Sequence, residues 1–145
     1  MARQSSDSRS GERVTKPDSQ WREDLTRAQY EVLRRGGTER AGTGEYAYSE
    51  DPGTYRCAAC RAELFDSDTK YDSGTGWPSF TQPASEDAVE HVKERTFLGG
   101  SQTEVRCRSC ASHLGHVFPD GPRPTGQRYC MNSVALTLEP GRGSA

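Results

Sequence analysis

Two cysteine pairs place the strongest limit on how this chain can fold. Cys57-Ala-Ala-Cys60 and Cys107-Arg-Ser-Cys110 are CxxC motifs with 46 residues between them. Each motif presents two thiolates from a tight turn, and two such turns supply the tetrahedral four-sulfur coordination that is typical of structural zinc. Two disulfides or four unligated thiols are the alternatives. Because four thiolates leave no open coordination position, a zinc ion here would hold the fold together and the chemistry must lie elsewhere.

The composition indicates a fold that needs a metal crosslink for its stability. The chain has 145 residues, of which 31% are hydrophobic and 28% charged, and it contains 15 glycines and 8 prolines. A single domain of this length with so few apolar side chains buries a modest core. The abundance of glycine and proline favours short strands joined by many turns.

Charge and hydropathy exclude several classes of protein. The net charge is −2, so no excess of positive charge favours binding to nucleic acid or to an anionic membrane. No apolar stretch approaches the roughly 20 residues of a membrane span, and the N-terminus lacks the apolar region of a secretory signal. Cysteines in CxxC pairs favour metal or redox chemistry in a reducing compartment, so we expect a cytoplasmic protein.

The chain divides into a short tail and one domain. Residues 1–18 have almost no apolar side chains and predict a disordered N-terminal tail. Residues 19–140 form the predicted domain, and residues 141–145 a flexible C-terminus. Within the domain, residues 25–37 predict a helix, in which Thr26 caps the N-terminus and Gly36 or Gly37 ends it.

Short segments with strand character follow this helix. TYRCAAC and AELFDS flank the first CxxC motif, AVEHVKERTF and TEVRCRSC lead into the second, and SVALTLEP ends the domain. The prediction is therefore a mainly β, mainly antiparallel fold with a short N-terminal helical region.

Cys130 is the one cysteine outside the CxxC pairs, and its neighbours are unusual for a packing residue. In an extended chain the side chains of Arg128, Cys130 and Asn132 point to the same face. The arginine would favour the thiolate, and the asparagine could hold a polar substrate group. A lone thiol in this setting is a candidate nucleophile, whereas the alternative is a small buried hydrophobic residue.

Two further motifs carry side chains suited to chemistry. SHLGHVF contains His113 and His116, whose imidazoles can donate a proton near neutral pH, or alternatively bind the metal. In GTGWPSF, Gly74 and Gly76 allow a tight loop that presents Trp77, either to a ligand or to the core.

The order of these motifs resembles that of the B-type methionine-R-sulfoxide reductases over residues 21–140. The matching stretches are VLRRGGTERAGTGEY, the first CxxC, YDSGTGWPSF, the second CxxC, SHLGHVFPDG and RYCMNSVAL. The resemblance implies two small antiparallel sheets stapled by one structural zinc ion per chain. It also implies reduction of methionine-R-sulfoxide to methionine.

The resemblance assigns roles to the catalytic candidates. Cys130 corresponds to the nucleophile that attacks the sulfoxide sulfur and becomes a sulfenic acid. His113 and His116 correspond to the histidine pair that places or protonates the departing oxygen. Asn132 corresponds to the residue that helps to organise this site.

The same resemblance assigns the substrate contacts and the metal ligands. Trp77 corresponds to the indole that packs against the substrate methyl group. Arg128 corresponds to the arginine before the catalytic cysteine and is expected to help bind the substrate. The zinc ligands are expected to be Cys57, Cys60, Cys107 and Cys110.

The chain departs from many of these relatives at Thr75, where they carry a resolving cysteine. We therefore expect the sulfenic acid on Cys130 to be reduced by an external thiol, such as thioredoxin, glutaredoxin or a small thiol. A zinc-site cysteine that resolves Cys130 is the weaker alternative. The expected substrates are oxidised proteins, with free methionine sulfoxide as the alternative. The expected oligomeric state is a monomer that binds neither nucleic acid nor membrane.

Two other functions are compatible with the cysteine pattern. One is a zinc-ribbon module that binds another macromolecule, although such a module needs neither Cys130 nor the histidine motif. The other is a peroxide-reactive thiol sensor, in which Cys130 would react with peroxide in place of a sulfoxide.

Overall fold

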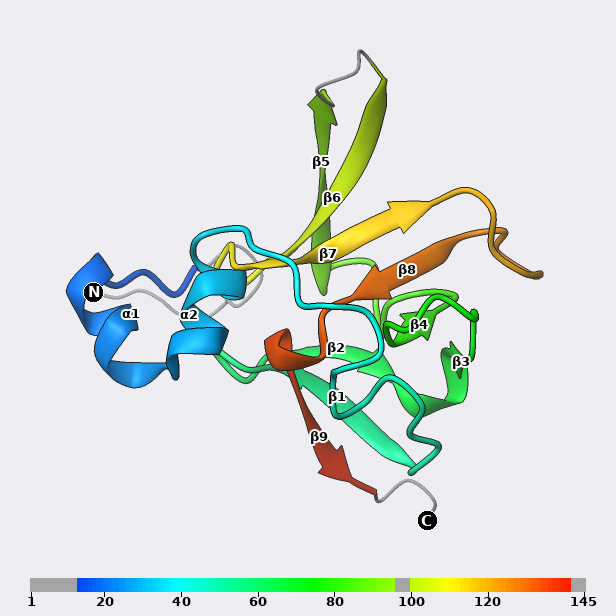
Figure 1. Ribbon diagram of the computed structural model, residues 1–145, viewed down its shortest axis with the longest axis horizontal. Helices are drawn as coiled ribbons and strands as arrows, with labels where there is room; N and C mark the ends of the chain where they lie inside the picture. Colours follow the sequence, from blue (N-terminus) through cyan, green and yellow to red (C-terminus); the bar gives the residue numbers. More distant parts are fainter. Residues whose placement is uncertain (1–12, 96–99, 142–145) are drawn as a thin grey trace.

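The computed structural model describes residues 13–95 and 100–141 as nine strands, two α-helices and two 3-10 turns (Figure 1). The helices are α1 (Asp18–Asp24) and α2 (Arg27–Leu33). The 3-10 turns are η1 (Ser67–Thr69) and η2 (Ser133–Ala135). The strands are β1 (Gly53–Cys57), β2 (Glu63–Asp66), β3 (Lys70–Tyr71), β4 (Ser79–Phe80), β5 (Val89–Arg95), β6 (Ser101–Cys107), β7 (His113–Phe118), β8 (Arg128–Met131) and β9 (Leu136–Pro140).

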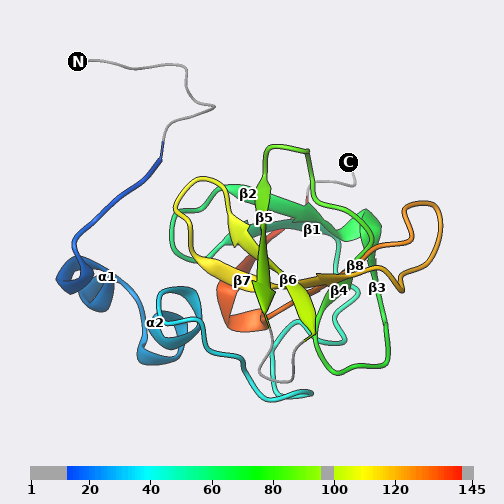
Figure 2. The same cartoon turned by 90° about the horizontal axis from the view of Figure 1, so that it is seen from above.

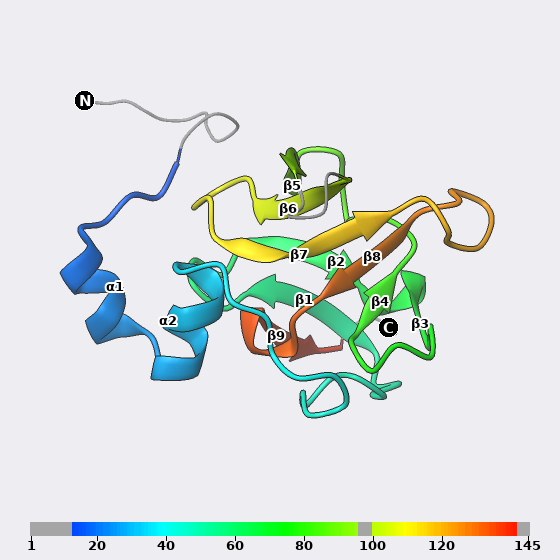
Figure 3. The same ribbon diagram turned by 45° about the horizontal axis from the view of Figure 1, so that its top comes forward.

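The strands form two antiparallel sheets. The smaller has the order β2-β1-β9, and the larger has the order β3-β4-β8-β7-β6-β5. Figure 3 shows the small sheet beneath β7 and β8 of the large one, and Figure 2 shows both helices to one side of the strands. The predicted mainly β fold, with two antiparallel sheets and a short N-terminal helical region, is confirmed.

Aromatic side chains from both sheets meet in the core. Phe65 of the small sheet stacks on Phe80 of the large sheet with ring centroids 4.4 Å apart. Tyr55 meets the same Phe80 edge-on at 5.2 Å, and Tyr129 of β8 lies 5.7 Å from Phe65. Such pairs each contribute about 0.5–1.5 kcal/mol beyond their buried area. This cluster holds the small sheet against the middle of the large one.

The helical region begins earlier than expected. The predicted helix is present as α2, and Thr26 and Gln29 form a reciprocal capping box at its N-terminus. In addition, α1 begins at Asp18 and buries Trp21, whose indole lies 4.4 Å beneath the Arg34 guanidinium. Neither helix in the part of the chain that the structure describes is long and apolar enough to span a bilayer.

Residues 1–12 of the predicted tail and residues 142–145 of the predicted C-terminus lie outside the described residues. Within the remainder of that tail, the Val14 N–H donates to the Ser109 carbonyl at 2.7 Å. The predicted domain limits stay predictions. At the C-terminal end, residues 133–135 form η2 instead of strand, so β9 begins at Leu136.

Candidate active site and metal site

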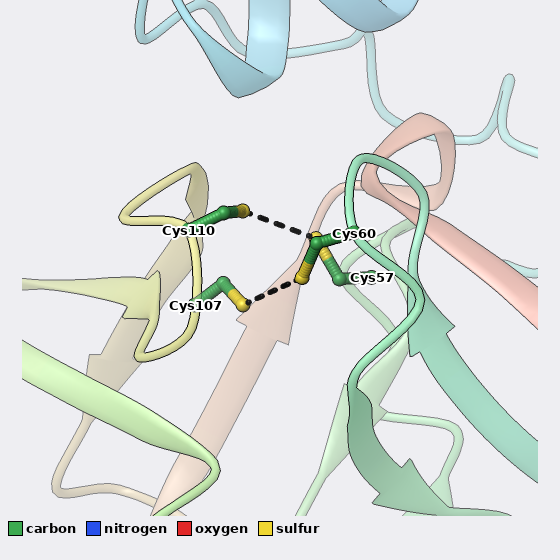
Figure 4. Close-up of side chains that lie close together, drawn as sticks. All are labelled: Cys57, Cys60, Cys107 and Cys110. Carbon is green, nitrogen blue, oxygen red and sulfur yellow. Dashed lines mark hydrogen bonds between the residues drawn. The ribbon is translucent and has the colours of Figure 1, made fainter. Parts of the chain in front are cut away.

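The four cysteines of the CxxC pairs converge at one point. Their sulfurs all lie within 4.8 Å of one another, and Figure 4 shows the two pairs facing each other from separate turns. The Sγ–Sγ distances are 3.7 Å between Cys57 and Cys110 and 3.6 Å between Cys60 and Cys107. A tetrahedron of sulfurs at about 2.3 Å from zinc has edges of about 3.8 Å, so this donor set fits the ion.

The two turns repeat the same hydrogen bonds. In the first turn, between β1 and β2, the Arg61 N–H donates to the Cys57 carbonyl at 2.8 Å, and Arg61 has a φ of 72°. In the second, between β6 and β7, the Ala111 N–H donates to the Cys107 carbonyl at 2.8 Å, and Ala111 has a φ of 64°. Because one turn belongs to each sheet, a metal ion bound here would link the two sheets.

The thiols of this cluster influence one another strongly. Hydrogen bonding to neighbouring sulfurs, first of all that of Cys107, raises the pKa of Cys57 and lowers the pKa of Cys60 to about 7. Four thiols this close cannot all ionise unless a cation compensates their charge. The cluster could therefore hold a cation.

Cys130 lies in the wall of a cavity of about 340 Å³ on the large sheet. Its strand β8 runs between β4 and β7, and the register places Ser79 and His116 directly opposite Cys130. Directly opposite residues of antiparallel strands share a face, so His116 stands beside the thiol. The cavity is lined by Thr38, Thr75, Trp77, Gly115, His116, Phe118, Arg128, Cys130 and Asn132. As predicted, Arg128, Cys130 and Asn132 face the same space.

Burial is the main influence on the Cys130 thiol and raises its pKa. A hydrogen bond from the Thr75 hydroxyl and the charge of Arg128 both lower it, but only in part. Arg128 itself is paired with Asp120, at 2.8 Å from Nε to Oδ1 and 3.2 Å from Nη2 to Oδ2. The effect predicted for Arg128 is present, yet burial outweighs it, and the pKa of Cys130 lies above its ordinary value.

A β-bulge brings the two histidines together. Residues three apart on a regular strand point to opposite faces, but Leu114 is an extra residue in β7 where it pairs with β6. The rings of His113 and His116 therefore lie edge to face, with centroids 5.5 Å apart. His116 faces the cavity, whereas His113 is 6% exposed and lies behind it.

Each histidine is held by a carboxylate of the same sheet, His113 by one from the neighbouring β6 and His116 by one from β5, two strands away. His113 Nδ1 lies 2.7 Å from Oε2 of the buried Glu104, and His113 Nε2 is buried without a hydrogen-bond partner among the described residues. His116 Nε2 lies 3.1 Å from Oε1 of Glu94. Although burial raises the pKa of Glu94, hydrogen bonds from His116 and Gln102 lower it below its usual range. Neither glutamate could be identified from the sequence, because its pairing with a histidine depends on strand register.

Trp77 reaches the cavity from the predicted loop. Gly76 has a φ of 93°, and a Cβ there would lie 2.8 Å from the Gly42 nitrogen, so the loop needs glycine at this position. The Trp77 indole Nε1–H donates to the Glu39 carbonyl at 3.0 Å. The indole thus has a fixed orientation, and Trp77 lines the cavity.

Asn132 follows β8 and is almost fully buried. Its Nδ2 donates to the Leu114 carbonyl at 3.0 Å, and its Oδ1 accepts from the Glu39 N–H at 3.0 Å. These two bonds fix which end of the amide is the donor. Asn132 also lines the cavity, and N–H donation to Leu114 uses one of its two Nδ2 protons.

Comparison with known proteins agrees with this geometry. Residues 25–140 match the family model described as the SelR domain. A peptide methionine sulfoxide reductase MsrB of Leifsonia xyli subsp. xyli is 57% identical over 128 residues, covering 88% of this chain and 91% of the relative. Proteins of the same name from Bradyrhizobium diazoefficiens and Pseudomonas paraeruginosa are 55% and 53% identical over 129 and 131 residues. The alignments cover 92% and 98% of those two relatives.

Proposed function

Because the chain belongs to the B-type methionine sulfoxide reductases and is a peptide-methionine (R)-S-oxide reductase, we propose that Cys130 is the residue that attacks the substrate sulfur. The observation that supports this most is the cavity that Cys130 shares with Trp77, His116 and Asn132. A methionine sulfoxide side chain needs an apolar surface for its methyl group and donors for its oxygen. The cavity offers both within reach of the thiol.

The reaction begins with a net transfer of oxygen from one sulfur to another. The Cys130 sulfur attacks the sulfoxide sulfur, and an S–S bond forms as the S–O bond breaks and the protonated oxygen leaves as water. Water then attacks the Cys130 sulfur, the S–S bond breaks, and methionine is released with Cys130 as a sulfenic acid. Cysteine sulfur is oxidised by two electrons and methionine sulfur is reduced by two. The oxygen is a poor leaving group until it is protonated, so a donor must stand beside the nucleophile.

His116 is the proton donor that fits this step best. It stands opposite Cys130 in the ladder between β7 and β8 and lines the same cavity. Glu94 holds its Nε2 at 3.1 Å and so fixes the orientation of the ring. His113, fixed by Glu104 behind it, acts on the oxygen through His116 or through water.

The remaining side chains bind and orient the substrate. Trp77 presents its indole to the methyl group, and the free Nδ2 proton of Asn132 can donate to the sulfoxide oxygen. Arg128 is stacked 4.4 Å from the Phe118 ring centroid and paired with Asp120, so it forms a rigid wall beside Cys130. Hydrogen bonding by Thr75 lowers the pKa of Cys130 and would stabilise the thiolate as it forms.

The metal that we propose for the cysteine cluster is one zinc ion per chain, held by Cys57, Cys60, Cys107 and Cys110. A zinc ion bound by four thiolates supplies a rigid crosslink and no open position for chemistry. The two turns lie in different sheets, so the crosslink would hold the small sheet against the sheet that carries Cys130. The thiols also suit a reducing compartment such as the cytoplasm.

We propose that recycling comes from outside the chain. The four other cysteines all belong to the metal cluster, and Thr75 stands where many relatives carry a resolving cysteine. An external thiol attacks the sulfenic acid and releases water, and a second thiol reduces the mixed disulfide to restore Cys130. We propose thioredoxin, glutaredoxin or a small thiol as this reductant, with oxidised proteins as the main substrates and a monomer as the working form.

A substitution at Thr75 tests this account of recycling. Thr75→Cys would supply a second thiol beside Cys130, so we expect faster thioredoxin-dependent turnover and an intramolecular disulfide after one cycle without reductant. Thr75→Ser is the matched control, since it keeps the hydroxyl and adds no sulfur. Unchanged turnover of Thr75→Cys, with no disulfide by mass spectrometry, would contradict the proposal.

The function itself is tested with a mixture of the two N-acetyl-methionine sulfoxide epimers. The zinc-loaded protein and its Cys130→Ser variant are incubated with dithiothreitol, and chiral chromatography follows each epimer. We expect loss of the R epimer alone, abolished by the substitution. If folded, zinc-loaded protein consumed neither epimer, a zinc-ribbon module or a peroxide-reactive thiol would have to be considered in its place.

A further inference from the structure

Glu39 contacts several parts of the site through different groups. Its backbone N–H donates to Asn132 Oδ1 and its backbone carbonyl accepts from Trp77 Nε1, each at 3.0 Å. Its carboxylate accepts from the Ser133 N–H at 2.7 Å and from the Val134 N–H at 3.1 Å. One residue in the loop between α2 and β1 therefore touches both a proposed oxygen-binding side chain and a proposed methyl-binding side chain.

We propose that Glu39 is a positioning residue for sulfoxide reduction. Its carboxylate anchors its own backbone to η2, and the N–H and carbonyl of that backbone orient Asn132 and Trp77. The inference rests on the proposed roles of those two residues. Glu39 does not reach the reacting atoms itself, and it acts through the side chains that do.

The capping of η2 shows why a carboxylate is needed here. Asn132 is the N-cap residue of η2, and asparagine is a favoured capping residue, yet its side chain makes no capping bond. Its amide is committed to Leu114 and to the Glu39 backbone instead. The Glu39 carboxylate supplies the missing cap to Ser133 and Val134, and this leaves the Asn132 amide at the cavity.

The surrounding loop leaves little room for another arrangement. A Cβ on Gly44 would lie 2.5 Å from Glu39 Oε2 and 2.2 Å from Ser133 Oγ. The Ser133 hydroxyl in turn accepts from the Tyr46 N–H at 3.2 Å. The carboxylate is thus enclosed between η2 and the loop, so shortening or neutralising it would release the Glu39 backbone.

The charge of Glu39 also allows an effect on substrate positioning to be distinguished from an effect on the reactivity of Cys130. Burial is the main cause of the raised pKa of Cys130, and the negative charge of Glu39 adds to it. Removing the charge should therefore leave the thiol at least as reactive toward iodoacetamide at a fixed pH. If Glu39 positions the substrate-binding groups, reduction of the sulfoxide must nevertheless slow down.

The experiment compares Glu39→Ala and Glu39→Gln with Glu45→Gln, which changes an exposed glutamate on the same loop. Zinc content, melting temperature, iodoacetamide reactivity and kcat/KM for the R epimer are measured for each. Misplacement of a binding group by about 1 Å lowers rates by on the order of 100-fold, so we expect about that loss for Glu39→Ala. Glu39→Gln keeps one acceptor and should lose about tenfold, while Glu45→Gln should match the wild type.

A double-mutant cycle with Asn132→Ala decides whether Glu39 acts through Asn132. We expect Glu39→Ala to lower kcat/KM by a smaller factor once Asn132 is already alanine, because only its effect through Trp77 then remains. An equal loss in both backgrounds, or no loss in the wild-type background, would overturn the inference. An inactive wild-type protein, or an active Cys130→Ser variant, would instead refute the proposed function on which it rests.

Discussion

Gly115→Ala should disrupt the site through a single added methyl group. Gly115 lies in β7 beside His116, and a Cβ there would lie 2.1 Å from the Cys130 carbonyl oxygen and 2.9 Å from the Met131 Cα. Ordinary contacts between carbon and carbonyl oxygen are about 3.3 Å or longer, so β7 and β8 must separate locally by about 1 Å. Since this ladder sets the distance between His116 and Cys130, the change reaches the reacting groups directly.

The expected magnitude follows from the packing. Overpacking a well-packed site costs about 1–3 kcal/mol, and each weakened ladder hydrogen bond adds about 1 kcal/mol. We therefore expect the free energy of unfolding to fall by about 2–4 kcal/mol. A displacement of about 1 Å should lower kcat/KM for the R epimer by on the order of 100-fold.

Urea unfolding of the zinc-loaded protein and steady-state kinetics with the resolved R epimer measure these two effects. Gly126→Ala is the control: Gly126 has a φ of 73°, and no atom lies within 4 Å of the added Cβ. It should lose about 1–2 kcal/mol from backbone strain and keep its activity. If Gly115→Ala kept kcat/KM within about threefold of the wild type, the role assigned to strand spacing would be refuted.

Three further outcomes are expected. Because burial raises the pKa of Cys130, its alkylation rate should keep rising with pH above about 9, the ordinary range of a thiol. Thr75→Val should move the midpoint of this pH dependence higher still. A midpoint below about 8 in an iodoacetamide titration would contradict this expectation. Cys110→Ser should lower the zinc content and reduce the melting temperature by at least about 10 °C, as zinc analysis and calorimetry would report, and a zinc-free variant that melts with the wild type would count against a structural metal. Glu104→Gln replaces the carboxylate that holds the His113 ring by a neutral amide and weakens that hydrogen bond, so we expect kcat for the R epimer to fall; an unchanged kcat would remove Glu104 from the proton path.

Features set by nearby residues could be predicted from the sequence. The helix that begins after Thr26 depends on a cap and on its own apolar face, both of which are local. The CxxC turns depend on a four-residue spacing, and their convergence follows from the coordination that thiolates favour. The shared face of Arg128, Cys130 and Asn132 follows from the alternation of an extended chain.

Features set by strand register could not be predicted. The bulge at Leu114 decides that His113 and His116 share a face, and nothing in their spacing indicates it. Glu104 reaches His113 only because β6 pairs with β7 in one particular register. The raised pKa of Cys130 could not be predicted either, because the burial that causes it depends on segments distant in the sequence.

The pairing of β1 with β9 has a consequence for biosynthesis. Cys57 lies opposite Leu136 in this ladder, so β1 can complete its pairing only after the last segment of the domain has been synthesised. Contacts between such distant segments form late, after the entropy of closing a long loop has been overcome. A ribosome that is still translating residue 130 therefore carries a nascent chain whose central strand β1 has only β2 beside it. During that interval the aromatic residues of the core and the thiols of the first turn are open to chaperones, oxidants and metal carriers alike.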